Sequence, residues 1–447
     1  MKPSGYTGKI LPMEIPGQRN RYTAAALGSL AMLVVIFIAV GLMLTSCRKP
    51  SPMPTWSIYI YLDGDNDLSN SAVADLLEMA AVGSSDRITI VVQIDRLGET
   101  AKRYRIVPGG WELLADLGEL DMASPQTIQD FLVWAGEMYP ADRKVLILWN
   151  HGNGWDQGDG PSSPAAPLRN AGKAQRSILY DDDNGMGGAS PFLSNHVVKQ
   201  AIETSNISLD ILGLDASIMG TFEALYEFKD LAPILISSQE VGESHGWDYT
   251  AIFSNLVRNP GMSTEDLSRV IVDSYGNFFE NSFYPLLPAY EKRHSIAAIR
   301  TAYLGPLATE IDGLAVGLTG RLNDPAMKDA ALTTIGTARL SVQEIDKYNQ
   351  PYVYVDLMDL DRLLNQGTVI SQLLTGATIA EYHGTARPNA HGLSIVFFRF
   401  PEAIASNTFD SNYKNYDAAT NTGNSGDFIN FHLWDEFLAT YYSAAGV

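Results

Sequence analysis

The chain has 447 residues, of which 46% are hydrophobic and 18% charged, a balance typical of a globular protein with a large core. Its formal net charge of −20 disfavours binding to nucleic acid, and the sequence contains no basic patch that would override this charge. A single cysteine excludes a disulfide within the chain, so the core has to stabilise the folded state.

Residues 1–46 have the pattern of an export signal. Lysines and arginines precede the apolar run AAALGSLAMLVVIFIAVGLML, and small residues come directly before Cys47. The sequence Leu-Thr-Ser-Cys resembles a bacterial lipoprotein signal, in which Cys47 carries lipid and begins the mature chain. A transmembrane anchor is the alternative, because the run is about long enough to span a bilayer. Both interpretations place the bulk of the chain outside the cytoplasm.

A Pro-rich tether is expected at residues 47–54, and a regular alternation of elements follows it. Apolar runs predict buried strands at residues 56–62, 87–95, 144–150, 209–215 and 233–238, with a hairpin at 103–107 and 111–118. Helical segments lie between the strands. Two of them open with a Ser-Pro pair, at Ser124 and Ser190, which predicts a serine N-cap followed by proline at the first helical position. The alternation predicts an α/β fold with a mostly parallel sheet covered on both faces.

Two polar residues follow the C-terminal ends of predicted strands, where ligands of such sheets collect. His151 follows one strand and Ser217 another, so we expect them at the same sheet edge. A long polar loop, residues 156–177, lies between them in sequence, and loops of this length in compact domains are functional or disordered. The chain is less regular from about residue 256 and is expected to pack against the first half.

Five motifs in the first half occur in a fixed order: WSIYIYLDGDNDL, VVQIDR, LILWNHGNGW, LGLDASIMGTFEALYE and SSQEVGESHGWDY. In this order and at these spacings they resemble the clostripain family of cysteine peptidases, which belongs to the caspase-like group. The resemblance implies a caspase-like α/β/α sandwich with a mostly parallel central sheet. It implies a peptidase core at residues 55–255 and a C-terminal α+β extension, residues 256–447, packed on it.

The resemblance also assigns roles to individual residues. His151 matches the catalytic histidine of an Asn-His-Gly motif, and the backbone of Gly152 helps to hold the oxyanion. Asp215 matches an acid in the pocket for a basic P1 side chain, and Ser217 stands at the position of the nucleophilic cysteine. His245 stands where the family commonly has a second acid for this pocket. Apart from the resemblance, Ser217 reads as a helix N-cap and His245 as a surface loop residue.

Serine at the nucleophile position changes the expected chemistry. A thiol ionises readily beside a positive histidine, whereas a hydroxyl has to be deprotonated during attack by a base that a third group orients. We therefore expect an exported, lipid-anchored peptidase homologue that binds peptides and is inactive or weakly active. The alternative is an active endopeptidase that uses Ser217 and His151 to cleave peptide bonds after basic residues. Whether the chain is an enzyme stays open at this point.

Family members are often matured by cleavage at a basic residue between the histidine and the cysteine. Arg169, Lys173 and Arg176 lie in the corresponding loop, residues 156–177. If Ser217 cannot attack, that cleavage requires another protease. We therefore expect the purified protein to remain a single chain.

Other chemistry has little support in the sequence. There is no H-E-x-x-H motif or Cys/His cluster for zinc, and no G-x-S-x-G elbow around Ser217. The acidic stretches at residues 63–67 and 181–185 could hold Ca²⁺, with which the family is associated. Neither completes an EF-hand, since Leu68 stands where glycine belongs. A solvated acidic turn is the other interpretation, and we assign no metal ligand.

Overall fold

A computed structural model describes residues 53–155, 178–181, 192–347, 350–364, 369–399, 413 and 426–446. These residues belong to one compact unit that begins at Met53. The expected export signal, Cys47 and the loop at 156–177 lie outside the described residues. Within the described part of the chain, no helix is both long enough and apolar enough to cross a bilayer.

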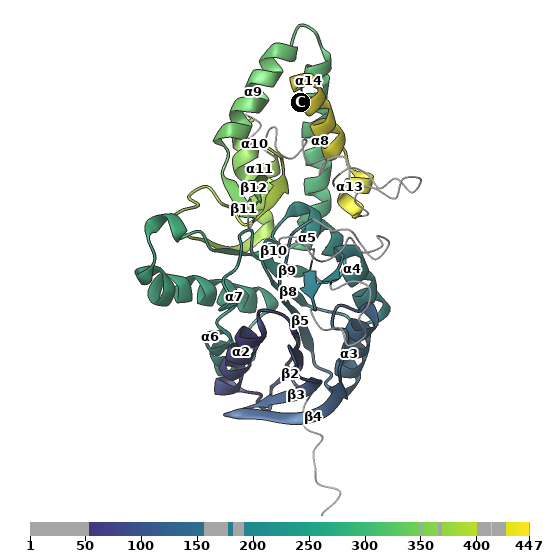
Figure 1. The fold of residues 1–447 in the computed structure, drawn as a ribbon, viewed down its shortest axis with the longest axis vertical. Helices are drawn as coiled ribbons and strands as arrows, with labels where there is room; N and C mark the ends of the chain where they lie inside the picture. The colour runs from purple at the N-terminus through teal and green to yellow at the C-terminus, as the bar shows by residue number, and fades with distance from the viewer. Residues whose placement is uncertain are drawn as a thin grey trace, which may run out of the picture. The chain divides into compact units, whose positions relative to one another are not determined.

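A nine-stranded sheet forms the centre of the molecule (Figure 1). Its five central strands are parallel: β9 (Ile234–Ser237), β8 (Ile211–Asp215), β5 (Arg143–Trp149), β1 (Trp56–Gly64) and β2 (Ile88–Arg96). The outer strands are antiparallel: β3 (Ala101–Val107), β4 (Gly110–Gly118), β10 (Ser295–Arg300) and β13 (Thr378–His383). All five predicted strands and the hairpin are present within about two residues of their predicted ends, which confirms the mostly parallel sheet.

Helices cover both faces of this sheet, because both faces of the strands are apolar. Along β1, Ile58 and Ile60 belong to one buried cluster and Tyr59 and Tyr61 to the other, as the alternation of side chains in a strand requires. One face is covered by α2 (Ser69–Val82), α6 (Tyr249–Arg258) and α7 (Thr264–Phe278). The other is covered by α3 (Pro125–Met138), α4 (Asn195–Thr204) and α5 (Phe222–Phe228), as Figure 1 shows.

The C-terminal part extends the same core. It contributes β10 and β13 to the main sheet and adds a small sheet of β11 (Glu344–Lys347), β12 (Gln350–Asp356) and β14 (Ser394–Val396). Further helices pack here, among them α8 (Leu304–Asn323), α9 (Lys328–Ser341), α10 (Leu357–Leu363), α11 (Val369–Ala377) and α14 (Trp434–Ala445). The expected border between residues 255 and 256 falls inside α6, so it does not separate two compact units.

The two predicted Ser-Pro helix starts have different outcomes. The predicted start at Ser124 and Pro125 is observed in α3. The second Ser-Pro pair lies outside the described residues, and the residues that follow it form strand β7 (Phe192–Leu193), which pairs with β6 (Ile178–Tyr180). Helix α4 begins after Ser194, whose hydroxyl accepts the Val197 N–H at 3.3 Å.

The predicted N-cap role of Ser217 is also wrong. Helix α5 begins at Phe222, and its N-cap is Thr221, whose side chain accepts the Ala224 N–H at 3.3 Å. The residues between Ser217 and Thr221 form a turn instead, in which Ile218 has a φ of +63°.

Candidate active site

A cleft of about 190 Å³ opens at the C-terminal edge of the parallel strands. His151 and Asn150 follow β5, and Asp215 and Ser217 lie at the end of β8, so the sheet brings them to one edge. Aromatic side chains form the walls: Trp149, Trp247 and Tyr275. The expected juxtaposition of His151 and Ser217 at one sheet edge is therefore observed.

The imidazole of His151 is held by an acid from another loop. Its Nε2 lies 2.6 Å from Oδ1 of Asp67, in the loop between β1 and α2, and its side chain is one-third exposed. Asn150 steadies the backbone, because its side-chain oxygen accepts the His151 N–H and its amide donates to the Tyr180 carbonyl at 2.9 Å. A histidine oriented by a carboxylate has the base–orienter arrangement of a catalytic triad. Sequence reasoning missed this role and grouped Asp67 with a candidate calcium stretch.

Ser217 is held in a strained turn. Its hydroxyl oxygen accepts the Gly242 N–H at 3.0 Å, and the residue is 7% exposed. A positive φ at Ile218 is a genuine outlier for a β-branched residue. The Ile218 N–H donates to the Glu240 carbonyl at 2.9 Å. The segment after β9, residues 238–242, therefore holds the turn in place by contacts from outside it. Gly152 packs against the Ser217 carbonyl, where a Cβ would collide with it.

No hydrogen bond joins the two candidate catalytic side chains among the described residues. The Ser217 hydroxyl accepts from Gly242, while His151 Nε2 faces Asp67. A hydroxyl nucleophile needs its base within hydrogen-bond reach of its proton. In this arrangement the histidine has an orienting partner, but the serine is not engaged by the histidine.

Asp215 lies at the base of the cleft. Its Oδ2 accepts the hydroxyl of Tyr249 at 2.8 Å and the backbone N–H of Trp247 at 3.2 Å. Burial raises the pKa of Asp215 to about 7, and these two hydrogen bonds oppose that rise. The carboxylate is thus poised to change charge near neutral pH.

His245 does not line the cleft formed by the described residues. Its ring is exposed and lies against Phe278 and Phe283, with centroid distances of 5.8 and 5.3 Å. The next residue, Gly246, does line the cleft. Of the residues singled out from the sequence, His151, Asp215 and Ser217 meet in one cleft, Gly152 supports Ser217, and His245 lies outside it.

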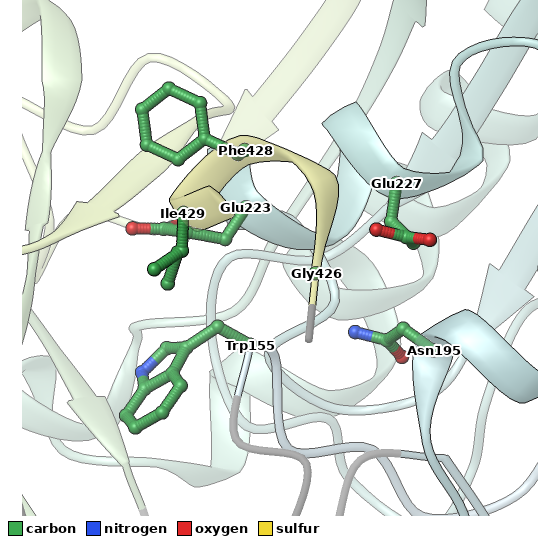
Figure 2. Close-up of a pocket in the computed structure, with 7 residues that line it drawn as sticks. All are labelled: Trp155, Asn195, Glu223, Glu227, Gly426, Phe428 and Ile429. Atoms are coloured by element: carbon green, nitrogen blue, oxygen red, sulfur yellow. The ribbon is translucent and has the colours of Figure 1, made fainter. Parts of the chain in front are cut away.

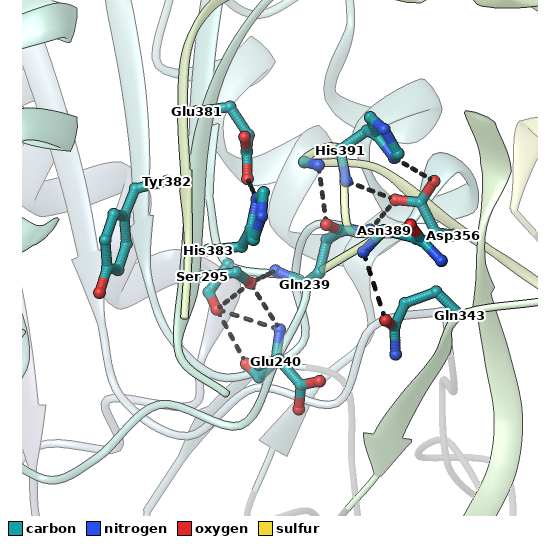
Figure 3. Close-up of polar contacts among 12 residues, drawn as sticks. Gln239, Glu240, Ser295, Gln343, Asp356, Glu381, Tyr382, His383, Asn389 and His391 are labelled. Atoms are coloured by element: carbon teal, nitrogen blue, oxygen red, sulfur yellow. Dashed lines mark hydrogen bonds and ion pairs between the residues drawn. The ribbon is translucent and has the colours of Figure 1, made fainter. Parts of the chain in front are cut away.

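The C-terminal part of the chain braces the segment after β9, as Figure 3 shows. Ser295 on β10 accepts the backbone N–H groups of Gln239 and Glu240 at 3.2 and 3.3 Å. The amide of Gln239 donates to Asp356 at 3.1 Å, and the buried carboxylate of Glu240 pairs with Arg387. Residues from beyond position 290 therefore set the position of the Gly242 N–H that reaches Ser217.

A buried group of carboxylates lies near the ends of β1 and β2. Asp63, Asp65, Asp95 and Asp181 are each at most 1% exposed. Burial is the main cause that raises the pKa of Asp63 well above its usual range and those of Asp95 and Asp181 to about 8. Hydrogen bonds from the backbone of Asp65 and the side chain of Asn150 oppose the rise at Asp63 without cancelling it.

The chemistry of these carboxylates suits Ca²⁺, but among the described residues no three of them bring their ligand atoms within 4.8 Å of one another. Of the described His, Cys, Asp and Glu side chains, one trio has its ligand atoms within 4.8 Å of one another: His196, Glu227 and Asp427. Lys199 already supplies a positive charge to these side chains, since its ammonium lies 2.5 Å from Asp427 and 3.6 Å from Glu227. These side chains form an ion-pair network. Residues 182–185 of the second acidic stretch lie outside the described residues.

A second cavity lies beside this network, between Trp155, Asn195, Glu223 and α13 (Asp427–Phe431), as Figure 2 shows. Its volume of about 10 Å³ leaves room for one water at most. It therefore offers no second ligand site.

Comparison with known proteins agrees with the fold and the motifs. A sequence model of the clostripain family matches residues 60–386. Clostripain of Hathewaya histolytica is 26% identical over 241 residues, which cover 47% of this chain and 44% of that protein. The match thus spans less than half the length of this curated relative.

Two crystal structures share the fold. The first is a secreted C11 cysteine protease from Bacteroides thetaiotaomicron in complex with an irreversible peptide inhibitor, with a TM-score of 0.60 and 18% identity over 88% of this chain and 99% of that one. The second is an inactive zymogen C11 protease from Parabacteroides distasonis, with a TM-score of 0.58 and 16% identity over 80% and 96% of the two chains. The family match over most of the chain, the ordered motifs and this fold establish that the chain belongs to the clostripain family.

Proposed function

We propose that this chain is an exported, lipid-anchored member of the clostripain family that binds peptides in the cleft and hydrolyses them weakly or not at all. Export and anchoring through Cys47 rest on the N-terminal sequence, and the relative from Bacteroides thetaiotaomicron is described as secreted. Peptide binding rests on family membership and on the cleft itself.

One observation carries the proposal of weak or absent turnover. The Ser217 hydroxyl accepts a hydrogen bond from Gly242, and His151 faces Asp67 instead of Ser217. A thiolate tolerates a more distant histidine, because the histidine only has to stabilise an ionised sulfur. A serine gains nothing from that arrangement until the base reaches its proton.

The remaining roles follow from position. The backbone N–H groups of Gly152 and Ser217 would hold the oxyanion of a bound carbonyl. Asp215, at the base of the cleft, would receive a lysine or arginine side chain of the peptide. His245 lies against two phenylalanine rings, and from this position it would shape the surface beside the pocket.

The alternative function is an active endopeptidase in which His151 deprotonates Ser217. The contact between His151 and Asp67 favours it, because an oriented histidine is what a serine nucleophile requires. In this alternative the imidazole turns from its present position until it accepts the Ser217 proton.

Hydrolysis of fluorogenic peptides that end in arginine or lysine decides between the two. The full-length chain in detergent is assayed beside Ser217→Cys and His151→Ala. We expect turnover only from the Ser217→Cys variant, which would show an intact scaffold with a silenced nucleophile. Turnover by the native chain that disappears in His151→Ala would establish the serine endopeptidase instead.

A further inference from the structure

Two buried carboxylates from different elements meet at the base of the cleft. Asp215 ends β8, and Asp75 lies on α2, where it is 1% exposed. A Cβ on Gly246 would lie 3.0 Å from Oδ2 of each carboxylate. The two oxygens are therefore no more than twice that distance apart, with the backbone of Gly246 packed over both.

The groups that contact this pair are neutral. Asp75 Oδ2 accepts the indole N–H of Trp149 at 2.6 Å. Asp215 Oδ2 accepts the hydroxyl of Tyr249 and the backbone N–H of Trp247. Among the described residues, no lysine, arginine or histidine forms an ion pair with either carboxylate. The pair thus has hydrogen bonds but no compensating positive charge.

The missing charge makes the pair costly to ionise. Burial, followed by the charge of Asp215, raises the pKa of Asp75 well above its usual range. Glu78, one turn further along α2, adds a third negative charge that raises the pKa of both aspartates. Two close buried carboxylates without a cation hold a proton between them, and a cation that enters the site releases it.

The cleft leads directly to this pair. Asp215, Gly246 and the indoles of Trp149 and Trp247 line it, so Asp215 is the member of the pair that faces the space where a ligand would lie. Aromatic faces attract cations, and an extended side chain between the two indoles would reach Asp215 first. Asp75 also lies against Gly246, and its negative charge would attract the same bound cation as Asp215 does.

This inference rests on the proposed function and adds a residue to it. We infer that Asp75 is the second acid of the pocket, a positioning residue that acts through Asp215. A lysine or arginine side chain of a bound peptide becomes the missing cation of the pair, and the proton that the two carboxylates share passes to the buffer.

Calorimetric titration of the full-length chain in detergent tests the inference with two peptides that differ only in one side chain, arginine or its neutral analogue citrulline. Each titration is repeated near pH 7 in buffers that differ in ionisation enthalpy. The change in observed binding enthalpy between buffers gives the number of protons released. We expect the native chain to prefer the arginine peptide by at least about tenfold and to release protons only with that peptide.

Asp75→Asn is the informative variant. Its amide oxygen still accepts from Trp149, so the hydrogen bond is kept while the charge is lost. We expect its preference for arginine over citrulline to fall about tenfold and its proton release to decrease. Asp273→Asn removes the same charge from an exposed position on α7 and should change neither quantity.

The outcomes separate the two proposals. Equal binding of both peptides by the native chain would overturn the basic-peptide function itself. A native preference for arginine that Asp75→Asn retains, with unchanged proton release, would overturn the role of Asp75 alone. The native chain provides a test that needs no variant, since arginine-peptide binding without proton release near pH 7 would contradict a shared proton.

Discussion

At the scale of single residues, the turn after β8 explains how Ser217 is presented. A β-branched residue with a positive φ costs energy, so the conformation of Ile218 persists only where surrounding contacts hold it. The Glu240 carbonyl and the Gly242 N–H provide those contacts, one to the Ile218 backbone and one to the Ser217 side chain. Because the backbone is held from outside, exchanging the side chain at position 217 should leave the turn in place.

Asp67 should affect kcat but not the affinity for peptides. In the Ser217→Cys background, we expect Asp67→Asn to lower kcat at least about tenfold, because an amide orients the ring but does not stabilise the imidazolium. The affinity for an arginine peptide should stay unchanged. Fluorogenic turnover and calorimetry measure the two quantities, with the exposed Asp86→Asn as a control. Equal kcat values in the two variants would remove Asp67 from the mechanism.

Ionisation of Asp63 should lower the free energy of unfolding as the pH rises. Its pKa is higher in the folded than in the unfolded chain, so its contribution is complete below the ordinary aspartate pKa of about 4 and is lost as the pH rises towards the raised value. Asparagine does not titrate and still fits the site. We expect Asp63→Asn to be more stable than the native chain by about 1–3 kcal/mol at pH 8, with a smaller gain at pH 5.

Urea unfolding at both pH values in buffer with EDTA measures this difference. Asp86→Asn again serves as the control, because its carboxylate is on the surface. A gain that is the same at pH 5 and pH 8 would contradict the titration of Asp63 as its cause.

At the scale of elements, the segment after β9 connects the candidate active site to the C-terminal part of the chain. Its backbone is bonded to Ser295 on β10, and its side chains reach Asp356 at the end of β12 and Arg387. The C-terminal part is thus needed to place the Gly242 N–H. Cutting the chain near residue 255 would remove these partners and split α6.

The pair of Glu240 and Arg387 should show this dependence. Glu240 is fully buried, so Arg387→Met leaves its charge poorly compensated, and we expect a loss of about 3 kcal/mol in the free energy of unfolding. The double variant Glu240→Gln with Arg387→Met should lose clearly less, because the buried charge is gone as well. Urea unfolding of the native chain, both single variants and the double variant measures the coupling. Additive losses would show that the two side chains act independently.

At the scale of the whole molecule, an inactive Ser217 predicts that the chain does not cleave itself. The purified native chain should run as one band over days, whereas Ser217→Cys should cut itself at Arg169, Lys173 or Arg176. Gel electrophoresis and mass spectrometry follow the fragments. Two fragments that arise from the native chain, and that His151→Ala prevents, would contradict an inert site.

The amino-acid sequence alone predicted the family, the buried strands along the chain, and the position of His151 and Ser217 at one sheet edge. These follow from local patterns: buried strands are continuous apolar runs, and the site residues stand directly after them. It also predicted the start of α3, where Ser124 and Pro125 act on the backbone next to them. After the second Ser-Pro pair, which lies outside the described residues, Phe192 and Leu193 pair with β6, and helix α4 begins only after Ser194.

Only the tertiary structure decided which distant residues complete the site. Asp67 meets His151 across 84 positions of sequence, and Asp75 on α2 meets Asp215 at the end of β8 where both carboxylates lie against Gly246. Nothing in the local sequence marks either acid, because its role depends on which strand ends lie next to each other and on which groups are buried there. His245 shows the converse, since its position in a motif placed it in the pocket while packing against Phe278 and Phe283 holds it outside.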